Sequence, residues 1–266
     1  MDVPGMYFLT GKRALVCGST QGIGRACAFL FAQLGASVIL LARNEAALTR
    51  VREELASSHG QRHDFIVADC NEPAQVRDRV LARLPALEPV HILLNNSGGP
   101  PAGELLASRA EDFTVAFARH VLCNHLLAQT LIGGMKSAGY GRIINIVSTS
   151  VKEPIPGLGV SNTIRAAVAN WAKTLAREVA PFGITVNNVL PGSTKTARIE
   201  EIIRARATAS GRTEQSIREE MISQIPMGRM AEPEEIAAAA GFLASPAAGY
   251  ITGINLPVDG GRTGCL

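Results

Sequence analysis

The stretch Gly18-Ser19-Thr20-Gln21-Gly22-Ile23-Gly24 decides the fold of this chain. It follows a short apolar run, Arg13–Cys17, and opens directly into a helical pattern. Glycines at this spacing allow a tight turn and a close backbone approach, and the free N–H groups at a helix start can bind a pyrophosphate. Strand, glycine-rich turn and helix in this order predict a dinucleotide-binding loop, with a turn that serves only helix packing as the alternative.

Short apolar runs alternate with longer helical patterns along the whole chain. The runs are continuously apolar, which indicates strands buried on both faces, as in a parallel sheet covered by helices. Right-handed crossovers then give an α/β fold of the Rossmann type, a doubly wound parallel sheet of seven strands. We expect one domain over residues 1–266 without linkers or repeats. The expected strands are Arg13–Cys17, Ala36–Ala42, Asp64–Ala68, Val90–Leu94, Arg142–Val147, Ile184–Val189 and Ile254–Pro257, and the expected helices include Gly22–Leu34, Glu45–Ser57 and Asn162–Ala180.

The segment Ala197–Ile225 fits this alternation least. It carries five arginines and five glutamates, and it ends at Pro226. The pattern predicts one or two amphipathic helices, and their place between the last two strands predicts a lid over the substrate at about residues 197–225. Arg204 and Arg206 are expected to meet an acidic or phosphopantetheine-bearing substrate. A solvated pair of helices is the alternative.

The composition excludes several classes of protein. A formal charge of +3 is too small and too dispersed for a nucleic-acid surface. No apolar stretch approaches the roughly eighteen residues of a membrane helix, and the first residues lack the basic start of a secretory signal. The five cysteines form no Cys-x-x-Cys pair, and the five histidines lack a metal-binding spacing. We therefore expect a cytoplasmic protein without a metal site.

Three further motifs occur in order after the glycine-rich loop. Asn95-Asn96-Ser97-Gly98 ends the fourth strand, Pro191-Gly192-Ser193-Thr194-Lys195-Thr196 follows the sixth, and residues 251–261 contain the last. With these motifs the chain resembles the short-chain dehydrogenase/reductase family, close to its 3-oxoacyl-carrier-protein-reductase-like members, from about Leu9 to Gly261. The resemblance implies a dinucleotide cofactor at the carboxyl ends of the strands.

The resemblance also implies which residues contact this cofactor. Asp69 and Cys70 would flank the adenine, and Asn95 to Gly98 the adenosine ribose. Thr194 and Thr196 would hold the nicotinamide side. The implied contacts together are Gly18, Ser19, Thr20, Gln21, Gly22, Ile23, Gly24, Arg43, Asp69, Cys70, Asn95, Ser97, Gly98, Arg165, Pro191, Gly192, Thr194 and Thr196.

The end of the second strand indicates which dinucleotide binds. Ala42 stands where an NAD site usually carries an acid for the ribose 2′-hydroxyl, and Arg43 follows it. A guanidinium suits a 2′-phosphate through its charge and its forked donors. We therefore predict NADP, with NAD as the alternative and a surface turn as the other role for Arg43. Gln21 stands where many NADP-binding relatives carry a second basic residue.

The positions that perform the family's reaction are altered in this chain. The family uses a tyrosine as proton donor, a lysine four residues later, a serine that polarises the carbonyl and an asparagine that holds a water relay. Only three tyrosines occur, and none has a lysine four residues later. The matching positions are Ser148 for the serine, Ser161 for the tyrosine, Arg165 for the lysine and His120 for the asparagine.

These replacements change what the site can do with a proton. Arg165 can hold a ribose, but its fixed charge cannot join a proton relay. The Ser161 hydroxyl is a poor acid near neutral pH. His120 titrates near neutrality and Lys152 leaves the same strand end as Ser148, so these two are the candidates for the missing acid. Alternatively, His120 is a satisfied helix residue, and Lys152 is solvated or paired with Glu153.

The sequence thus predicts an NADP-dependent oxidoreductase, a carbonyl reductase similar to 3-oxoacyl reductases, with an altered catalytic tetrad. It would act on a small-molecule carbonyl or alcohol and bind neither nucleic acid nor membrane. The alternative is a non-catalytic dinucleotide-binding subunit with a regulatory or partner role. A lyase or dehydratase that uses Ser148 and Lys152 has no positive support. The resemblance implies a homodimer or homotetramer.

Overall fold

A parallel sheet of seven strands forms the centre of the protein, in the order β3-β2-β1-β4-β5-β6-β7. The computed structural model describes residues 4–86 and 89–265. The strand order reverses between β1 and β4, which is the arrangement of a doubly wound sheet. The predicted Rossmann-type fold is therefore confirmed. The strands are β1 Arg13–Cys17, β2 Ser37–Ala42, β3 Asp64–Val67, β4 Ile92–Asn95, β5 Gly141–Ile146, β6 Ile184–Pro191 and β7 Asn255–Val258.

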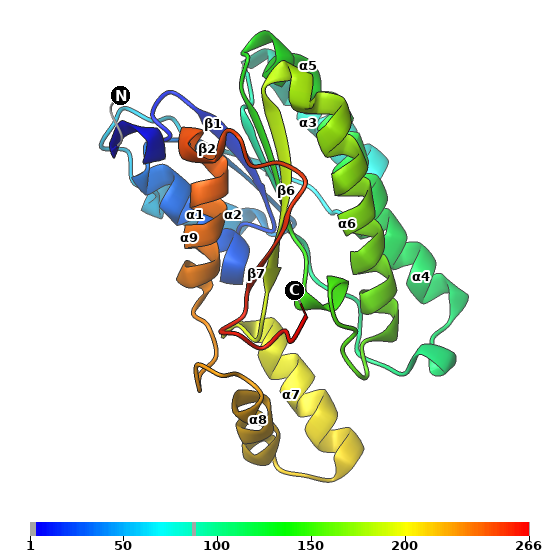
Figure 1. Ribbon diagram of the computed structural model, residues 1–266. Helices are drawn as coiled ribbons and strands as arrows, with labels where there is room; N and C mark the ends of the chain where they lie inside the picture. The colour runs from blue at the N-terminus through cyan, green and yellow to red at the C-terminus, as the bar shows by residue number, and fades with distance from the viewer. Residues whose placement is uncertain (1–3, 87–88, 266) are drawn as a thin grey trace.

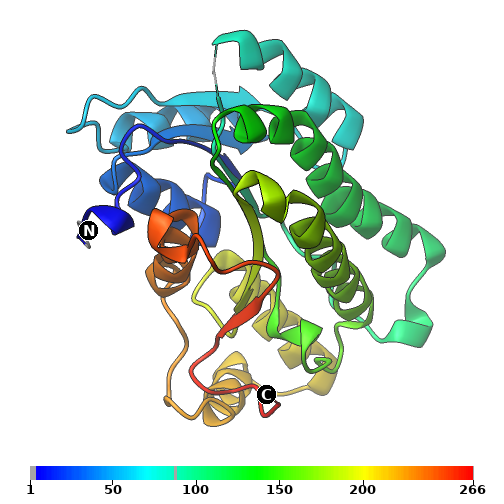
Figure 2. The same ribbon diagram turned by 45° about the horizontal axis from the view of Figure 1, so that its top comes forward.

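Neighbouring residues of each strand are buried in opposite layers. Ala14 and Val16 join the core beneath α1, α2 and α9, whereas Leu15 and Cys17 join the core beneath α3, α5 and α6. Figures 1 and 2 show α1 and α9 on one side of the sheet and α5 and α6 on the other. Burial of both faces explains why the strands are continuously apolar. These helices are α1 Gly22–Gln33, α2 Glu45–Glu54, α3 Pro73–Arg83, α5 Cys123–Ser137, α6 Gly159–Val179 and α9 Pro233–Ala244.

Two helices between β6 and β7, α7 Ala197–Ser210 and α8 Glu214–Ser223, confirm the predicted amphipathic pair. They pack on each other through a small apolar cluster of their own that includes Ile203, Ile217 and Met221. Figure 1 shows both helices beyond the end of the sheet, clear of the two main layers. Their action as a lid stays a prediction.

Several expected boundaries were wrong by one to three residues. The helix expected over Glu45–Ser57 ends at Glu54, because Leu55 has extended backbone angles, with φ −70° and ψ 140°. The last strand begins at Asn255, because the N–H of Ile254 donates to the Asn187 side chain rather than to a neighbouring strand. The helix expected from Asn162 begins at Gly159. Among the helices in the described ranges, none is long and apolar enough to cross a membrane.

Candidate functional site

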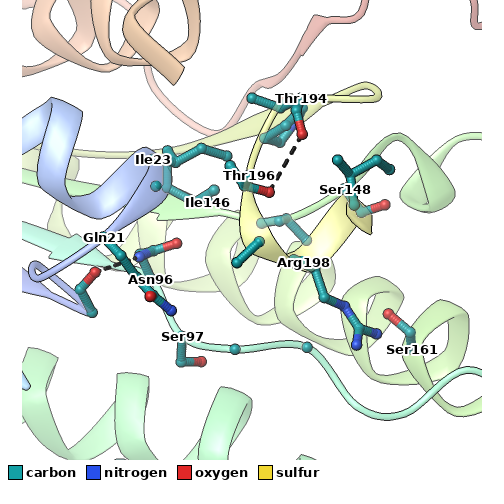
Figure 3. Close-up of a pocket in the computed structure, with 18 of the residues that line it drawn as sticks. Gln21, Ile23, Asn96, Ser97, Ile146, Ser148, Ser161, Thr194, Thr196 and Arg198 are labelled. Carbon is teal, nitrogen blue, oxygen red and sulfur yellow. Dashed lines mark hydrogen bonds between the residues drawn. The ribbon is translucent and has the colours of Figure 1, made fainter. Parts of the chain in front are cut away.

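A large cavity opens at the carboxyl ends of the strands. Its volume is about 640 Å³, and the loops that follow β1 to β6 line it together with α6 and α7. This is the edge at which open α/β sheets bind ligands. Figure 3 shows Gln21 and Asn96 at one end of the cavity and Ser148 and Ser161 at the other. Within the described part of the chain, no group of His, Cys, Asp and Glu side chains could hold a metal ion.

The glycine-rich loop is packed so tightly that side chains would not fit. A Cβ added at Gly24 would lie 2.2 Å from the carbonyl oxygen of Gly18, so these two backbones touch. Gly18 itself has φ +60°, which other residues rarely adopt. Gln21 precedes α1 without a side-chain hydrogen bond to the helix start, so the first N–H groups have no side-chain cap. A glycine cradle at an uncapped helix N-terminus fits a pyrophosphate.

The adenine end of the cavity is lined by Arg43, Asp69 and Cys70, as predicted. The Arg43 side chain is 74% exposed, and its ion pair with Asp69 is loose, at 3.8 Å. Its guanidinium is therefore free to meet a phosphate, which it would bind through charge-assisted hydrogen bonds. A hydrogen bond with Cys123 lowers the pKa of Cys70. This end of the cavity fits the 2′-phosphate of NADP.

Three of the predicted cofactor contacts, Asn95, Ser19 and Gly24, do not line the cavity. Asn95 is buried outside the cavity lining, where its amide donates to Asn145 at 2.8 Å. Asn145 donates in turn to Asn188, and Asn188 to Asn255, each at 2.8 Å. The four side chains form an asparagine ladder across β4, β5, β6 and β7, so Asn95 holds strands together. Ser19 is also fully buried, and its hydroxyl donates to the Leu41 carbonyl.

Asn96, which lies within the stretch Asn95 to Gly98 predicted to flank the adenosine ribose, lines the cavity, whereas Asn95 does not. Its amide donates to the carbonyls of Cys17 and Gly18, both at 3.3 Å, and so ties the glycine-rich loop to the end of β4. The sequence offered a signal for this position of Asn96, because adjacent residues of a strand face opposite layers. If the side chain of Asn95 is buried within the sheet, the side chain of Asn96 points in a different direction.

The loop after β6 brings Thr194 and Thr196 to the cavity with Pro191 and Gly192, as predicted. The Thr196 hydroxyl donates to the Thr194 carbonyl at 3.3 Å, as Figure 3 shows. A Cβ added at Gly22 would lie 3.2 Å from the Thr196 methyl group. The threonine loop therefore closes over the glycine-rich loop, as a site for one elongated ligand requires.

Three of the predicted catalytic residues line the same cavity, namely Ser148, Ser161 and Arg165. The Ser148 hydroxyl caps the short helix Thr149–Val151 by accepting from the Ser150 N–H at 3.1 Å. Arg165 lies on α6 one turn after Ser161 and donates to the Ile146 carbonyl at 3.0 Å. Its Nε is buried and has no partner among the described residues. Burial, with Arg198 and Arg119 nearby, lowers the pKa of Arg165 to about 10, so it stays charged at neutral pH.

The two candidate acids, His120 and Lys152, lie outside the cavity lining, so their proposed roles stay predictions. His120 is 2% exposed, and its Nδ1 is 2.9 Å from the Ser97 hydroxyl. Burial, then Arg165 and Arg119, lower the pKa of His120 to about 2, so its imidazole is neutral. Lys152 ends the short helix after β5, and its carbonyl accepts from the Cys265 thiol. Neither residue is among those that line the cavity.

The arginines around the cavity were only partly predicted. Arg206 lines it and donates to the Pro156 carbonyl at 3.3 Å, as expected, whereas Arg204 is exposed and does not line it. Arg119 and Arg198 also line the cavity and were not predicted. Whether the side chains of Arg119 and Arg198 point into the cavity depends on how the helical segments that carry them are placed around it. Sequence spacing does not reveal this placement.

Comparison with known proteins agrees with this geometry. A family model described as enoyl-(acyl carrier protein) reductase matches residues 18–263. A 3-oxoacyl-acyl-carrier-protein reductase from Vibrio cholerae is 33% identical over 255 residues, which cover 95% of this chain and 98% of the relative. An NADPH-dependent reductase from Bacillus subtilis is 30% identical over 254 residues, with 95% and 98% covered. The crystal structure of L-sorbose reductase from Gluconobacter frateurii with NADPH and L-sorbose has a TM-score of 0.91 at 30% identity, covering 98% of this chain and 100% of that one.

Proposed function

This chain belongs to the short-chain dehydrogenase/reductase family, and we propose that it is an NADPH-dependent carbonyl reductase that works without the family's tyrosine and lysine. One observation carries the proposal. Ser148, Ser161 and Arg165 line the same cavity as the glycine-rich loop and the threonine loop. A carbonyl compound bound between them would lie beside the cofactor cradle, where hydride transfer needs it.

NADP is the cofactor supported by both the site and the relatives. Ala42 ends β2 without a carboxylate, and the exposed Arg43 stands beside it. Relatives named as NADPH-dependent reductases match nearly the whole chain. When bound, the cofactor supplies the hydride. The glycine-rich loop would hold its pyrophosphate, Arg43 its 2′-phosphate, and Arg165 a ribose hydroxyl.

The substrate's oxygen would be held by hydroxyls and charge rather than by a tyrosine. In this proposal Ser148 and Ser161 donate hydrogen bonds to the carbonyl oxygen. Arg165 stabilises the negative charge that develops there, because a buried, fixed positive charge acts strongly in a site that excludes water. Arg165 cannot exchange a proton, so the proton would come from water through the serine hydroxyls. Loss of a tuned acid costs about two to four decades of rate, which predicts a slow enzyme.

The test is NADPH and NADH binding by calorimetry, followed by NADPH oxidation against a panel of aldehydes and ketones. We expect tighter binding of NADPH, slow turnover, and a further fall in kcat for Ser161→Ala. Lys152→Ala is the matched control and should leave kcat unchanged, since Lys152 lies outside the cavity lining. The double variant Ser161→Tyr, Arg165→Lys should raise kcat by restoring the acid and its partner.

Binding without turnover across the panel would instead favour a dinucleotide-binding subunit with a regulatory or partner role. The three catalytic positions predicted to be replaced and the neutral, enclosed His120 support that alternative. In that case only the double variant would reduce carbonyl compounds, and the wild-type protein would show none of this activity.

A homo-oligomer is part of the same proposal. Large apolar side chains are exposed around the helix α4 Ala110–Phe117, among them Leu106, Val115 and Leu122. An exposed group of this kind is typical of a protein–protein contact. Sedimentation equilibrium should therefore give a dimer or tetramer, and Leu106→Glu should shift the protein toward the monomer.

A further inference from the structure

Three arginines from different helical segments converge on one loop of the cavity, residues 98–100. Arg119, in the π-helical turn Ala118–Leu122, donates to the Gly98 carbonyl at 3.0 Å. Arg198 of α7 donates to the Pro100 carbonyl. A Cβ added at Gly99 would lie 3.6 Å from Arg165 Nη2 and 3.6 Å from Arg198 Nε and Nη2. The guanidinium groups of Arg165 and Arg198 therefore lie beside Gly99, within about 7 Å of each other.

No acid balances this charge at the centre of the group. Among the described residues that line the cavity, Asp69 is the only acid, and it lies at the adenine end beside Arg43. Arg198 has one ion pair, with the exposed Glu201 at 3.4 Å, and Arg165 has none within the described ranges. Arg165 is buried with a free Nε, so it holds a charge and an unused donor in the cavity wall. Two close cations with a single exposed counterion between them favour the binding of an anion.

The surroundings place this charge beside the reacting groups. Arg165 follows Ser161 by one helical turn, and Figure 3 shows the Arg198 side chain reaching from α7 toward the side where Ser161 lies. The neighbouring wall is apolar and contains Ile155, Leu158, Ile199 and Ile202. The proposed cofactor cradle has its own anion site at the start of α1. Arg198 is thus left for the other ligand, with the charge of Arg165 beside it.

We propose that the substrate is a carbonyl compound that carries an anionic group, a carboxylate or a phosphate, and that Arg198 together with Arg165 binds this group. The assignment rests on the proposed carbonyl reduction. The guanidinium fork matches either oxyanion through paired hydrogen bonds. Arg198 stands at the first turn of α7, so an anion bound there would also tie that helix to the cavity.

The test uses pairs of probes in which one member carries the anionic group and the other is a neutral analogue. Calorimetry on the protein with NADP⁺ measures binding of the 2-oxo acid of leucine against its methyl ester, and of dihydroxyacetone phosphate against dihydroxyacetone. We expect one anion to bind at least about tenfold more tightly than its neutral partner, since hydrogen bonds between charged groups are strong. The pair that shows the difference identifies carboxylate or phosphate.

Variants then assign the effect to Arg198. Arg198→Gln should remove most of the preference for the anion and leave NADPH affinity within about twofold. Arg198→Lys should keep part of the preference through its charge. Arg204→Gln on the same helix is the control, because Arg204 is exposed and does not line the cavity, and it should keep the full preference.

The outcomes separate this inference from the proposed function. Equal affinity of anion and neutral partner in both pairs overturns the inference, even if neutral carbonyl compounds are reduced. A loss of NADPH affinity in Arg198→Gln without loss of anion preference also overturns it, because Arg198 would then serve the cofactor. Anion preference without any NADPH oxidation supports the anion site and refutes the carbonyl reductase.

Discussion

Replacing His120 by asparagine, the residue that the family carries at this position, is expected to make the protein less sensitive to acid. His120 is 2% exposed, faces Arg165 and Arg119, and shares a hydrogen bond with Ser97. Burial first, and then the two arginines, lower its pKa from 6.5 to about 2. The folded protein therefore keeps His120 neutral under conditions in which the unfolded chain protonates it.

The sign and size follow from proton linkage. Below pH 6.5 the unfolded state binds a proton at this histidine that the folded state does not, so stability is complete above pH 6.5 and is lost as the pH falls toward 2. One pKa unit corresponds to about 1.4 kcal/mol. Between pH 7 and pH 5, His120 should thus remove about 2 kcal/mol from the free energy of unfolding.

Urea unfolding at pH 7 and pH 5 measures this difference. Each protein is compared with itself at the two pH values, so any change in the free energy of unfolding that the substitution causes through packing cancels. His120→Asn should lose about 2 kcal/mol less than the wild type between the two pH values. His59→Asn is the control, because His59 is exposed in a loop and meets water in both states. Equal acid sensitivity in His120→Asn and the wild type would refute the neutral, enclosed imidazole.

Gly24→Ala should abolish dinucleotide binding by calorimetry and lower Tm, because its Cβ would lie 2.2 Å from a carbonyl oxygen. Its control, Gly133→Ala in α5, meets nothing within 4 Å and should add up to about 1 kcal/mol of stability. Arg43→Ala should weaken NADPH binding about tenfold and leave NADH binding unchanged. The control Arg50→Ala, at an exposed position on α2, should leave the binding of both dinucleotides unchanged. If Arg43→Ala weakened NADPH and NADH binding equally, a contact between Arg43 and the 2′-phosphate would be excluded. Asn145→Ala should cost about 2 to 4 kcal/mol in urea unfolding by leaving buried ladder partners unsatisfied, and a loss under about 1 kcal/mol would contradict this.

The fold could be predicted from the sequence because its determinants are local. Continuously apolar strands indicate burial on both faces, and the right-handed crossover rule then leaves few arrangements of the sheet. The boundary errors come from single contacts or backbone angles. Leu55 turns extended at the end of α2, and Ile254 bonds to the Asn187 side chain. Neither contact leaves a periodic signal.

The site was harder to predict because it depends on register and direction. Asn95 and Asn96 are the same residue type at adjacent positions. Only the sheet register places Asn95 opposite Asn145 and leaves Asn96 to line the cavity. Lys152 ends the same short helix that Ser148 caps, yet its side chain does not line the cavity. Motif spacing fixes which residues share a loop, and it does not fix where each side chain points.

The altered catalytic residues have to be understood together. Burial and the positive charge of Arg165 together keep His120 neutral, so the residue at position 165 affects what the histidine can do. In the proposed reaction this removes both proton-carrying partners at once and leaves a permanent positive charge beside Ser161. Such a charge stabilises an oxyanion without exchanging a proton. The same charge, together with Arg198, favours an anionic substrate. Slow proton delivery and selection for an anion would therefore share one cause, a buried arginine that has no counterion among the residues the structure describes.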